Sequence, residues 1–151
     1  MRYYYFMATN SNKKKTLLVI DSNSWMHRAF HAIQFDLTAP DGRPTGAVFG
    51  YFNILSSTLA KIKPDAVIAA FDAGIPQFRF DALEQYKIQR PPTDPKLKQQ
   101  FPMVEELLRA MSVPVIKIEG YEGDDILGTI ARLAGEQGMH TYVASGDKDT
   151  Y

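Results

Sequence analysis

Acidic residues in this chain stand where several buried strands are expected to end. Asp21 closes the apolar run 16–20, and Asp72 closes a second run of similar design at 65–71. Because the carboxyl ends of parallel strands meet at one edge of a sheet, these acids are expected to lie together. Five more acids follow two later apolar runs, which makes seven candidates among the 17 acidic residues: Asp21, Asp72, Glu122, Asp124, Asp125, Asp147 and Asp149.

The chemistry of such a cluster follows from its charge. Seven carboxylates held close together repel one another and raise each other's pKa values, so a cation must neutralise them. An oxygen-rich, sulfur-free ligand set suits hard cations such as Mg²⁺ or Mn²⁺. Two such ions about 3.5–4 Å apart can activate a water and stabilise the leaving oxygen in phosphodiester cleavage. The pattern predicts a hydrolytic metal site, with the seven acids as metal ligands and catalytic residues.

Each acidic element also has an ordinary structural explanation. Acids at 122–125 open an expected helix, where the helix dipole favours negative charge. Residues 147–149 fit a turn, and Asp21 fits a strand-end cap. All of these explanations would have to hold together at one sheet edge, so we favour the metal site.

A histidine pair offers a second, weaker metal hypothesis. His27 and His31 lie four residues apart on an expected helix, which is a spacing that zinc sites use. No glutamate follows His27, and no third nitrogen or sulfur ligand is evident. We favour packing beside Trp25 and Phe30 over metal ligation.

The elements that would position these residues alternate along the chain. Strands are expected at 16–21, 65–72, 113–118 and 140–145, and apolar residues at helical spacing predict helices at 46–62, 101–111 and 122–137. This alternation predicts an α/β fold with a parallel sheet, right-handed crossovers and helices on both faces. Four prolines interrupt residues 73–100, which we expect to project as a functional excursion.

Composition narrows the class further. The 151 residues are 45% hydrophobic, enough for one domain with its own core. No apolar run approaches the roughly 20 residues of a membrane span, and the absence of cysteine excludes disulfides and thiolate chemistry. We expect a soluble, cytoplasmic protein. Net charge is zero, but residues 1–15 carry four basic residues and no acid, which predicts a flexible basic tail.

Several motifs, in order, resemble the 5′-nuclease domain attached to bacterial DNA polymerase I. They are LLVIDSNS at 17–24, RAF at 28–30, DGRPTGAVFG at 41–50, FDA at 71–73, FR at 78–79, YKIQR at 86–90, EGYEGDD at 119–125 and SGDKD at 145–149. The resemblance covers residues 16–151, and flap endonucleases and phage 5′-nucleases share the plan more distantly. It implies a PIN-like (resolvase-like) fold and divalent-metal hydrolysis of DNA at or near a 5′ end or flap.

The resemblance also assigns roles to residues. The seven acids match the metal-site carboxylates of the family. Arg79, Tyr86, Lys87 and Arg90 match the region that family members fold into an arch or gateway for the 5′ strand. Lys87 and Arg90 share a helical face and can contact phosphates, while Tyr86 can stack on an unpaired base. A solvated amphipathic helix is the alternative for this segment.

Two departures from the family pattern bear on activity. Gly123 stands where the family usually has alanine. The family continues past the position of Tyr151 with further metal-site aspartates and a helical element that grips duplex DNA, followed in the full-length protein by a polymerase region. We therefore expect an incomplete second ion site and weak or absent hydrolysis by this chain alone. Two other hypotheses stay open: a catalytically silent fragment that binds metal and DNA, and a phosphatase of small phosphoesters.

Overall fold

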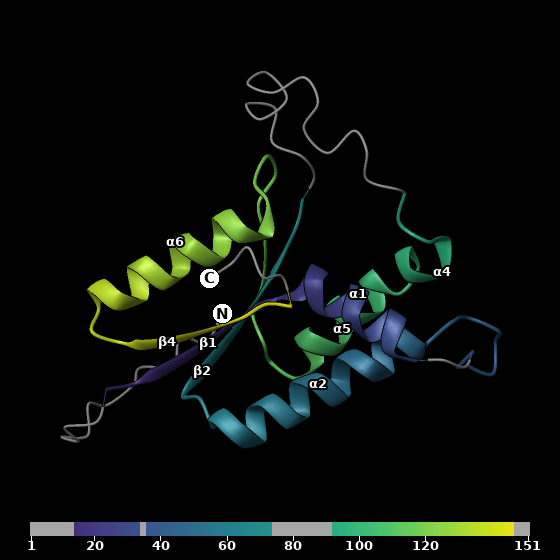
Figure 1. Cartoon of the computed structure of the whole chain (residues 1–151), viewed down its shortest axis with the longest axis horizontal. Helices are drawn as coiled ribbons and strands as arrows, with labels where there is room; N and C mark the ends of the chain where they lie inside the picture. The colour runs from purple at the N-terminus through teal and green to yellow at the C-terminus, as the bar shows by residue number, and fades with distance from the viewer. Residues whose placement is uncertain (1–13, 34–35, 74–91, 147–151) are drawn as a thin grey trace.

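The core of the molecule is a four-stranded parallel sheet. The computed structural model describes residues 14–33, 36–73 and 92–146. The strands are β1 (Thr16–Asp21), β2 (Ala66–Phe71), β3 (Val115–Lys117) and β4 (His140–Ala144), in the order β3-β2-β1-β4 (Figure 1). The apolar residues of β1 are all buried, because this interior strand is covered on both faces.

Helices pack on both faces of the sheet. Helix α6 (Gly123–Glu136) covers one face, whereas α1 (Ser22–Ala32), α2 (Gly46–Ile62), the short α4 (Pro95–Lys98) and α5 (Phe101–Ala110) lie on the other (Figure 1). Side chains of β1 alternate between the two faces, as strand geometry requires. Leu18 and Ile20 join the core cluster with α1, α2, α4 and α5, while Leu17 and Val19 join the cluster with α6.

The expected α/β fold is confirmed, with small differences at the ends of elements. Strand β3 spans three residues rather than the expected 113–118, and Pro114 precedes it. Proline has no N–H to donate to the ladder, although the Pro114 carbonyl accepts from the Ala69 N–H at 2.9 Å. Helix α4 was not predicted. Residues 1–13 and 74–91, which contain most of the expected tail and excursion, lie outside the described residues.

Among the described helices, none combines the length and the apolar character that a membrane span requires. The longest of them, α2, runs over 17 residues and keeps Ala47, Tyr51 and Leu55 on its buried face.

A buried glutamine that lies outside helix α2 caps the first turn of that helix. Thr45, at the N-cap position, makes no side-chain hydrogen bond to the first turn. The Gln100 Oε1 atom instead accepts from the N–H groups of Ala47 and Val48, at 2.8 and 3.2 Å. Its Nε2 atom donates to the Lys96 carbonyl at 3.0 Å, and the residue is 1% exposed. Gln100 therefore satisfies two helix-end donors and ties α2 to the segment between α4 and α5.

We predict that Gln100→Ala lowers the free energy of unfolding by about 1–3 kcal/mol, because two N–H groups at the start of α2 lose their shared acceptor. Urea denaturation followed by circular dichroism measures the change. Gln99→Ala is the matched control, because Gln99 is exposed, and its effect should stay within about 0.5 kcal/mol. Equal effects of the two substitutions would contradict the capping role.

Candidate functional site

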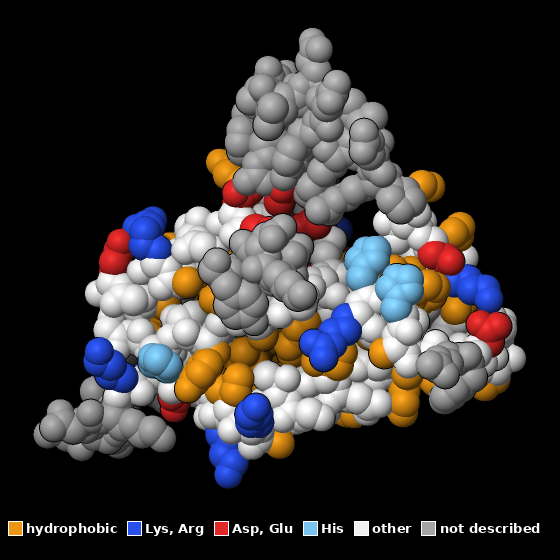
Figure 2. Space-filling view, viewed as in Figure 1, with side chains coloured by type: hydrophobic (Ala, Val, Ile, Leu, Met, Phe, Trp, Pro, Cys, Tyr) orange, Lys and Arg blue, Asp and Glu red, His pale blue; other side chains and the backbone are white. Residues whose placement is uncertain are grey.

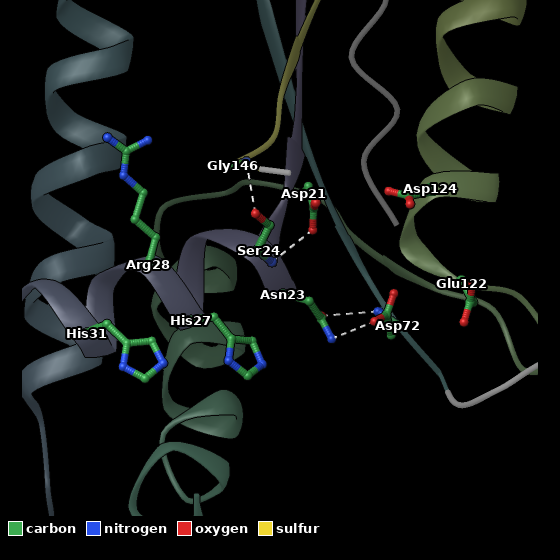
Figure 3. Close-up of a pocket in the computed structure, with 10 residues that line it drawn as sticks. All are labelled: Asp21, Asn23, Ser24, His27, Arg28, His31, Asp72, Glu122, Asp124 and Gly146. Atoms are coloured by element: carbon green, nitrogen blue, oxygen red, sulfur yellow. Dashed lines mark hydrogen bonds between the residues drawn. The ribbon is translucent and has the colours of Figure 1, made fainter. Parts of the chain in front are cut away.

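Four carboxylates line one cavity at the carboxyl edge of the sheet. The cavity has a volume of about 620 Å³. Asp21 ends β1, Asp72 directly follows β2, and Glu122 and Asp124 stand at the start of α6. Figure 3 shows these four side chains on one side of the site and three basic side chains of α1 on the other. The lining residues are Asp21, Asn23, Ser24, His27, Arg28, His31, Asp72, Glu122, Asp124 and Gly146.

Asp21 is held by two different elements. Its Oδ1 atom accepts from the Ser24 N–H at 3.0 Å, so the carboxylate caps helix α1. Its Oδ2 atom accepts from the Ser145 hydroxyl at 2.7 Å, directly after β4. The residue is only 6% exposed. Asp21 therefore acts as a cap at the end of its strand and also lies at the expected site, so the two explanations of this residue hold together.

Asp72 is held by α1 and α6. The Asn23 Nδ2 atom donates to Asp72 Oδ2 at 2.9 Å, and the Asp72 backbone N–H donates to Asn23 Oδ1 at 3.2 Å (Figure 3). The other carboxylate oxygen, Oδ1, accepts a short hydrogen bond from the Gly123 N–H. Two hydrogen bonds, one from each helix, thus orient this side chain, and a third holds its backbone against Asn23.

Glu122 and Asp125 form a capping box at the start of α6. Asp125 accepts from the Glu122 backbone N–H at 3.2 Å, which satisfies a donor at the helix end. Glu122 is 6% exposed and lines the cavity, as does Asp124. Asp125 is not among the lining residues, so the helix-start explanation applies to it directly.

The structure brings together four of the seven predicted acids and leaves the rest apart or untested. Asp147 and Asp149 lie outside the described residues, as do Arg79, Tyr86, Lys87 and Arg90. Within the described ranges, no group of three or more histidine, cysteine, aspartate or glutamate residues is arranged to hold a metal ion. The metal-ligand assignment therefore stays a prediction.

The histidine pair lies on the cavity wall. His27, Arg28 and His31 are exposed and line the cavity from α1. The expected contact with Phe30 is present for His31, with ring centroids 5.4 Å apart. Trp25 is on the buried side of the helix instead, in an edge-to-face contact with Tyr51 at 5.6 Å.

A buried hydroxyl pair fixes α1 against α2 next to the site. The Ser22 and Tyr51 hydroxyls are 2.9 Å apart and hydrogen-bonded, and both residues are fully buried. Burial raises the pKa of Tyr51 well above its ordinary value, so the phenol remains neutral and available for this hydrogen bond. The start of α1, which carries Asn23 and Ser24, is therefore anchored to the core.

Sequence reasoning missed Asn23, Ser24 and Gly146. The Gly146 N–H donates to Ser24 Oγ at 2.8 Å, which fixes the backbone as the chain leaves β4. One signal was available: Asn23 and Ser24 are polar and directly follow a buried strand that ends in an acid. Their partners were not readable, because these lie 49 and 122 positions away along the chain.

The fold and site define a resolvase-like α/β domain with carboxylates at the carboxyl edge of its sheet. Residues 16–151 match the family described as the 5′-3′ exonuclease, N-terminal resolvase-like domain. The chain therefore belongs to this nuclease family.

Relatives by sequence are bacterial DNA polymerases. DNA polymerase I of Bacillus caldotenax is 43% identical over 136 residues, a stretch that covers 90% of this chain and 15% of that protein. DNA polymerase I of Bacillus subtilis is 41% identical over 137 residues, covering 91% and 16%. The chain thus spans about 15% of the length of such relatives.

Solved structures agree on the fold. T5 5′-exonuclease with zinc ions bound superposes with a TM-score of 0.66 at 23% identity, covering 90% of this chain and 51% of that one. The bacteriophage T5 flap endonuclease in a complex with DNA and metal ions gives a TM-score of 0.63 at 21% identity, covering 90% and 50%.

We predict that Ser24→Ala frees the backbone after β4. Loss of the hydrogen bond to the Gly146 N–H should lower the free energy of unfolding by about 0.5–1.5 kcal/mol and speed amide hydrogen exchange at Gly146. Exchange measured by NMR, with Ser56→Ala on the exposed side of α2 as control, checks both. Unchanged Gly146 exchange would show that Ser24 does not restrain this segment.

Proposed function

We propose that this chain is the catalytic-site portion of a divalent-metal-dependent 5′-nuclease that hydrolyses phosphodiester bonds of DNA at a 5′ end or 5′ flap. The observation that carries the proposal is the shared cavity of Asp21, Asp72, Glu122 and Asp124 in a member of a 5′-3′ exonuclease family. The similarity to polymerase I supports a role in DNA replication and repair, in covalent continuity with a polymerase region.

The donor set fits a hard divalent cation. All four acids of the cavity offer oxygen, and the chain has no cysteine, a combination that suits Mg²⁺ or Mn²⁺. We assign Asp125, Asp147 and Asp149 to the same metal centre on the resemblance alone. Bound ions would supply an activated water and charge stabilisation at the leaving oxygen. The zinc-bound T5 5′-exonuclease supports divalent-metal use.

The residues of the chain divide the remaining work. His27, Arg28 and His31 form the wall opposite the carboxylates, where basic side chains can contact the phosphates of a bound strand. Asp21 and Asp72 are fixed by hydrogen bonds, so they can orient a cation without a rearrangement of the backbone. We assign the arch contacts with single-stranded DNA to Arg79, Tyr86, Lys87 and Arg90 on the resemblance.

Metal binding is the first test of this function. Mn²⁺ or Mg²⁺ should raise the melting temperature, since a ligand present at 100 times its Kd stabilises the fold by about 2.7 kcal/mol. Asp72→Ala should abolish the metal-dependent shift. Removal of one repelling charge should offset part of the loss of the two hydrogen bonds to the carboxylate in the metal-free protein.

Asp36→Ala is the matched control, because Asp36 is an exposed acid paired with Lys96 away from this cavity. Differential scanning fluorimetry across millimolar metal measures the shift in all three proteins. A shift that survives in Asp72→Ala would remove Asp72 from the ligand set, and no shift in the unsubstituted chain would contradict the metal centre.

Hydrolysis is the second test, and it separates the proposed function from its two competitors. Under single-turnover conditions with Mn²⁺, we expect slow, EDTA-sensitive cleavage of a 5′-flap DNA, little cleavage of plain duplex, and none of an aryl phosphate. We expect slow turnover because a substrate that is misplaced by about 1 Å already reacts about 100-fold more slowly. Binding of metal and flap DNA without cleavage favours a silent binding fragment. Turnover of the aryl phosphate favours a phosphatase.

A further inference from the structure

The Asp72 carboxylate is held between two helices. Each of its oxygens accepts a hydrogen bond: Oδ2 from the side chain of Asn23, and Oδ1 from the backbone N–H of Gly123. These donors come from opposite sides, since Asn23 belongs to α1 and Gly123 begins α6. The two helices lie on opposite faces of the sheet (Figure 1).

The Asn23 amide can make its contacts in only one orientation. A carboxylate only accepts hydrogen bonds and a backbone N–H only donates, so Nδ2 must face Asp72 Oδ2 and Oδ1 must face the Asp72 N–H. A flipped amide would lose both hydrogen bonds at once. Asn23 therefore binds the backbone and the side chain of Asp72 at the same time, and it restrains the carboxylate relative to the end of β2.

Gly123 leaves room for the Asp72 carboxylate because it has no side chain. A Cβ atom at this position would lie 2.9 Å from Asp72 Oδ1 and 3.9 Å from Asp21 Oδ1. The absence of a side chain allows the Asp72 carboxylate to approach the first N–H of α6, where the helix dipole favours negative charge. The carboxylate cannot withdraw freely from a larger residue, because Asn23 holds its other oxygen.

We propose that Asn23 and the bare backbone of Gly123 form a cradle that fixes the Asp72 carboxylate, and that Asn23 is thereby a positioning residue for the cation of this site. The cradle holds one acid in place with neutral donors, so a cation can be bound without first ordering that acid. The link to a cation rests on the proposed function, whereas the cradle itself is a property of the metal-free protein.

A double-substitution cycle tests the cradle without metal. Gly123→Ala should destabilise the protein, because the new methyl group meets a carboxylate that Asn23 restrains. In the Asn23→Ala background the same change should cost less, because the carboxylate can then turn aside, so the two effects should not add. Urea denaturation gives the four stabilities. Additive effects would overturn the proposal.

Matched controls isolate the local contact from general effects. Gly128→Ala, in the same helix with no atom within 4 Å of the added Cβ, should stabilise the protein through helix propensity alone. Asn53→Ala removes an exposed asparagine of α2 that is remote from Asp72 and should leave the Gly123→Ala effect unchanged. If Asn53→Ala relieves the Gly123→Ala effect as strongly as Asn23→Ala does, the cradle is wrong.

Two further readouts report on position. The Gly123 amide proton should resonate downfield in the metal-free protein and move upfield in Asn23→Ala and in the near-isosteric Asn23→Leu. In a Mn²⁺ titration followed by electron paramagnetic resonance, both Asn23 variants should weaken binding about 10-fold or more, as loss of an orienting partner does at metal sites.

The two parts of the inference fail separately. No Mn²⁺ binding by the unsubstituted chain would contradict the proposed function while the cycle and the amide shift still decide the cradle. Undiminished Mn²⁺ affinity in both Asn23 variants would overturn the positioning role, even if the cycle showed coupling between Asn23 and Gly123.

Discussion

The convergence of four carboxylates on one cavity at the edge of the sheet is the constraint on which the arrangement of this molecule depends. Parallel strands deliver Asp21 and Asp72 to the same edge, and the first turn of α6 adds Glu122 and Asp124. Hydrogen-bond donors offset the cost of holding these charges together. Ser24 and Ser145 donate to Asp21, while Asn23 and Gly123 donate to Asp72. The polar residues around the acids are therefore part of the stability of the fold as well as of its site.

The sequence predicted the parts of the fold that local pattern controls. The apolar runs that form β1 and β2 can be recognised from local sequence alone. Because parallel strands end at one edge of a sheet, these two runs predict that Asp21 and Asp72 lie together. The sequence pattern was less informative about β3, which begins directly after Pro114 and spans only Val115–Lys117. For the acids at 122–125, the local pattern did not indicate that Asp125 accepts a hydrogen bond at the helix start whereas Glu122 and Asp124 line the cavity.

Long-range side-chain contacts were beyond the reach of such patterns. Gln100 caps a helix 53 positions earlier in the chain, and nothing in its immediate sequence marks it as a cap. Asn23 looks like any polar residue after a strand, yet its amide joins the end of a different strand. These contacts depend on how finished elements pack, so they are a property of tertiary structure. The arch residues Arg79 to Arg90 remain predictions, since they lie outside the described residues.

Helix α1 couples the core to the site because its two faces have different partners. Trp25, Met26 and Ala29 are buried in the core, and a Cβ at Gly50 would lie 2.9 Å from the Ala29 Cβ, which shows how closely α2 approaches. The opposite face carries the side chains that border the cavity and reach Asp72 and Gly146. A helix packed this tightly cannot shift on one side alone. The apolar packing of α1 therefore determines where its polar face meets the carboxylates, and a core substitution beneath it would act on the site through the same rigid helix.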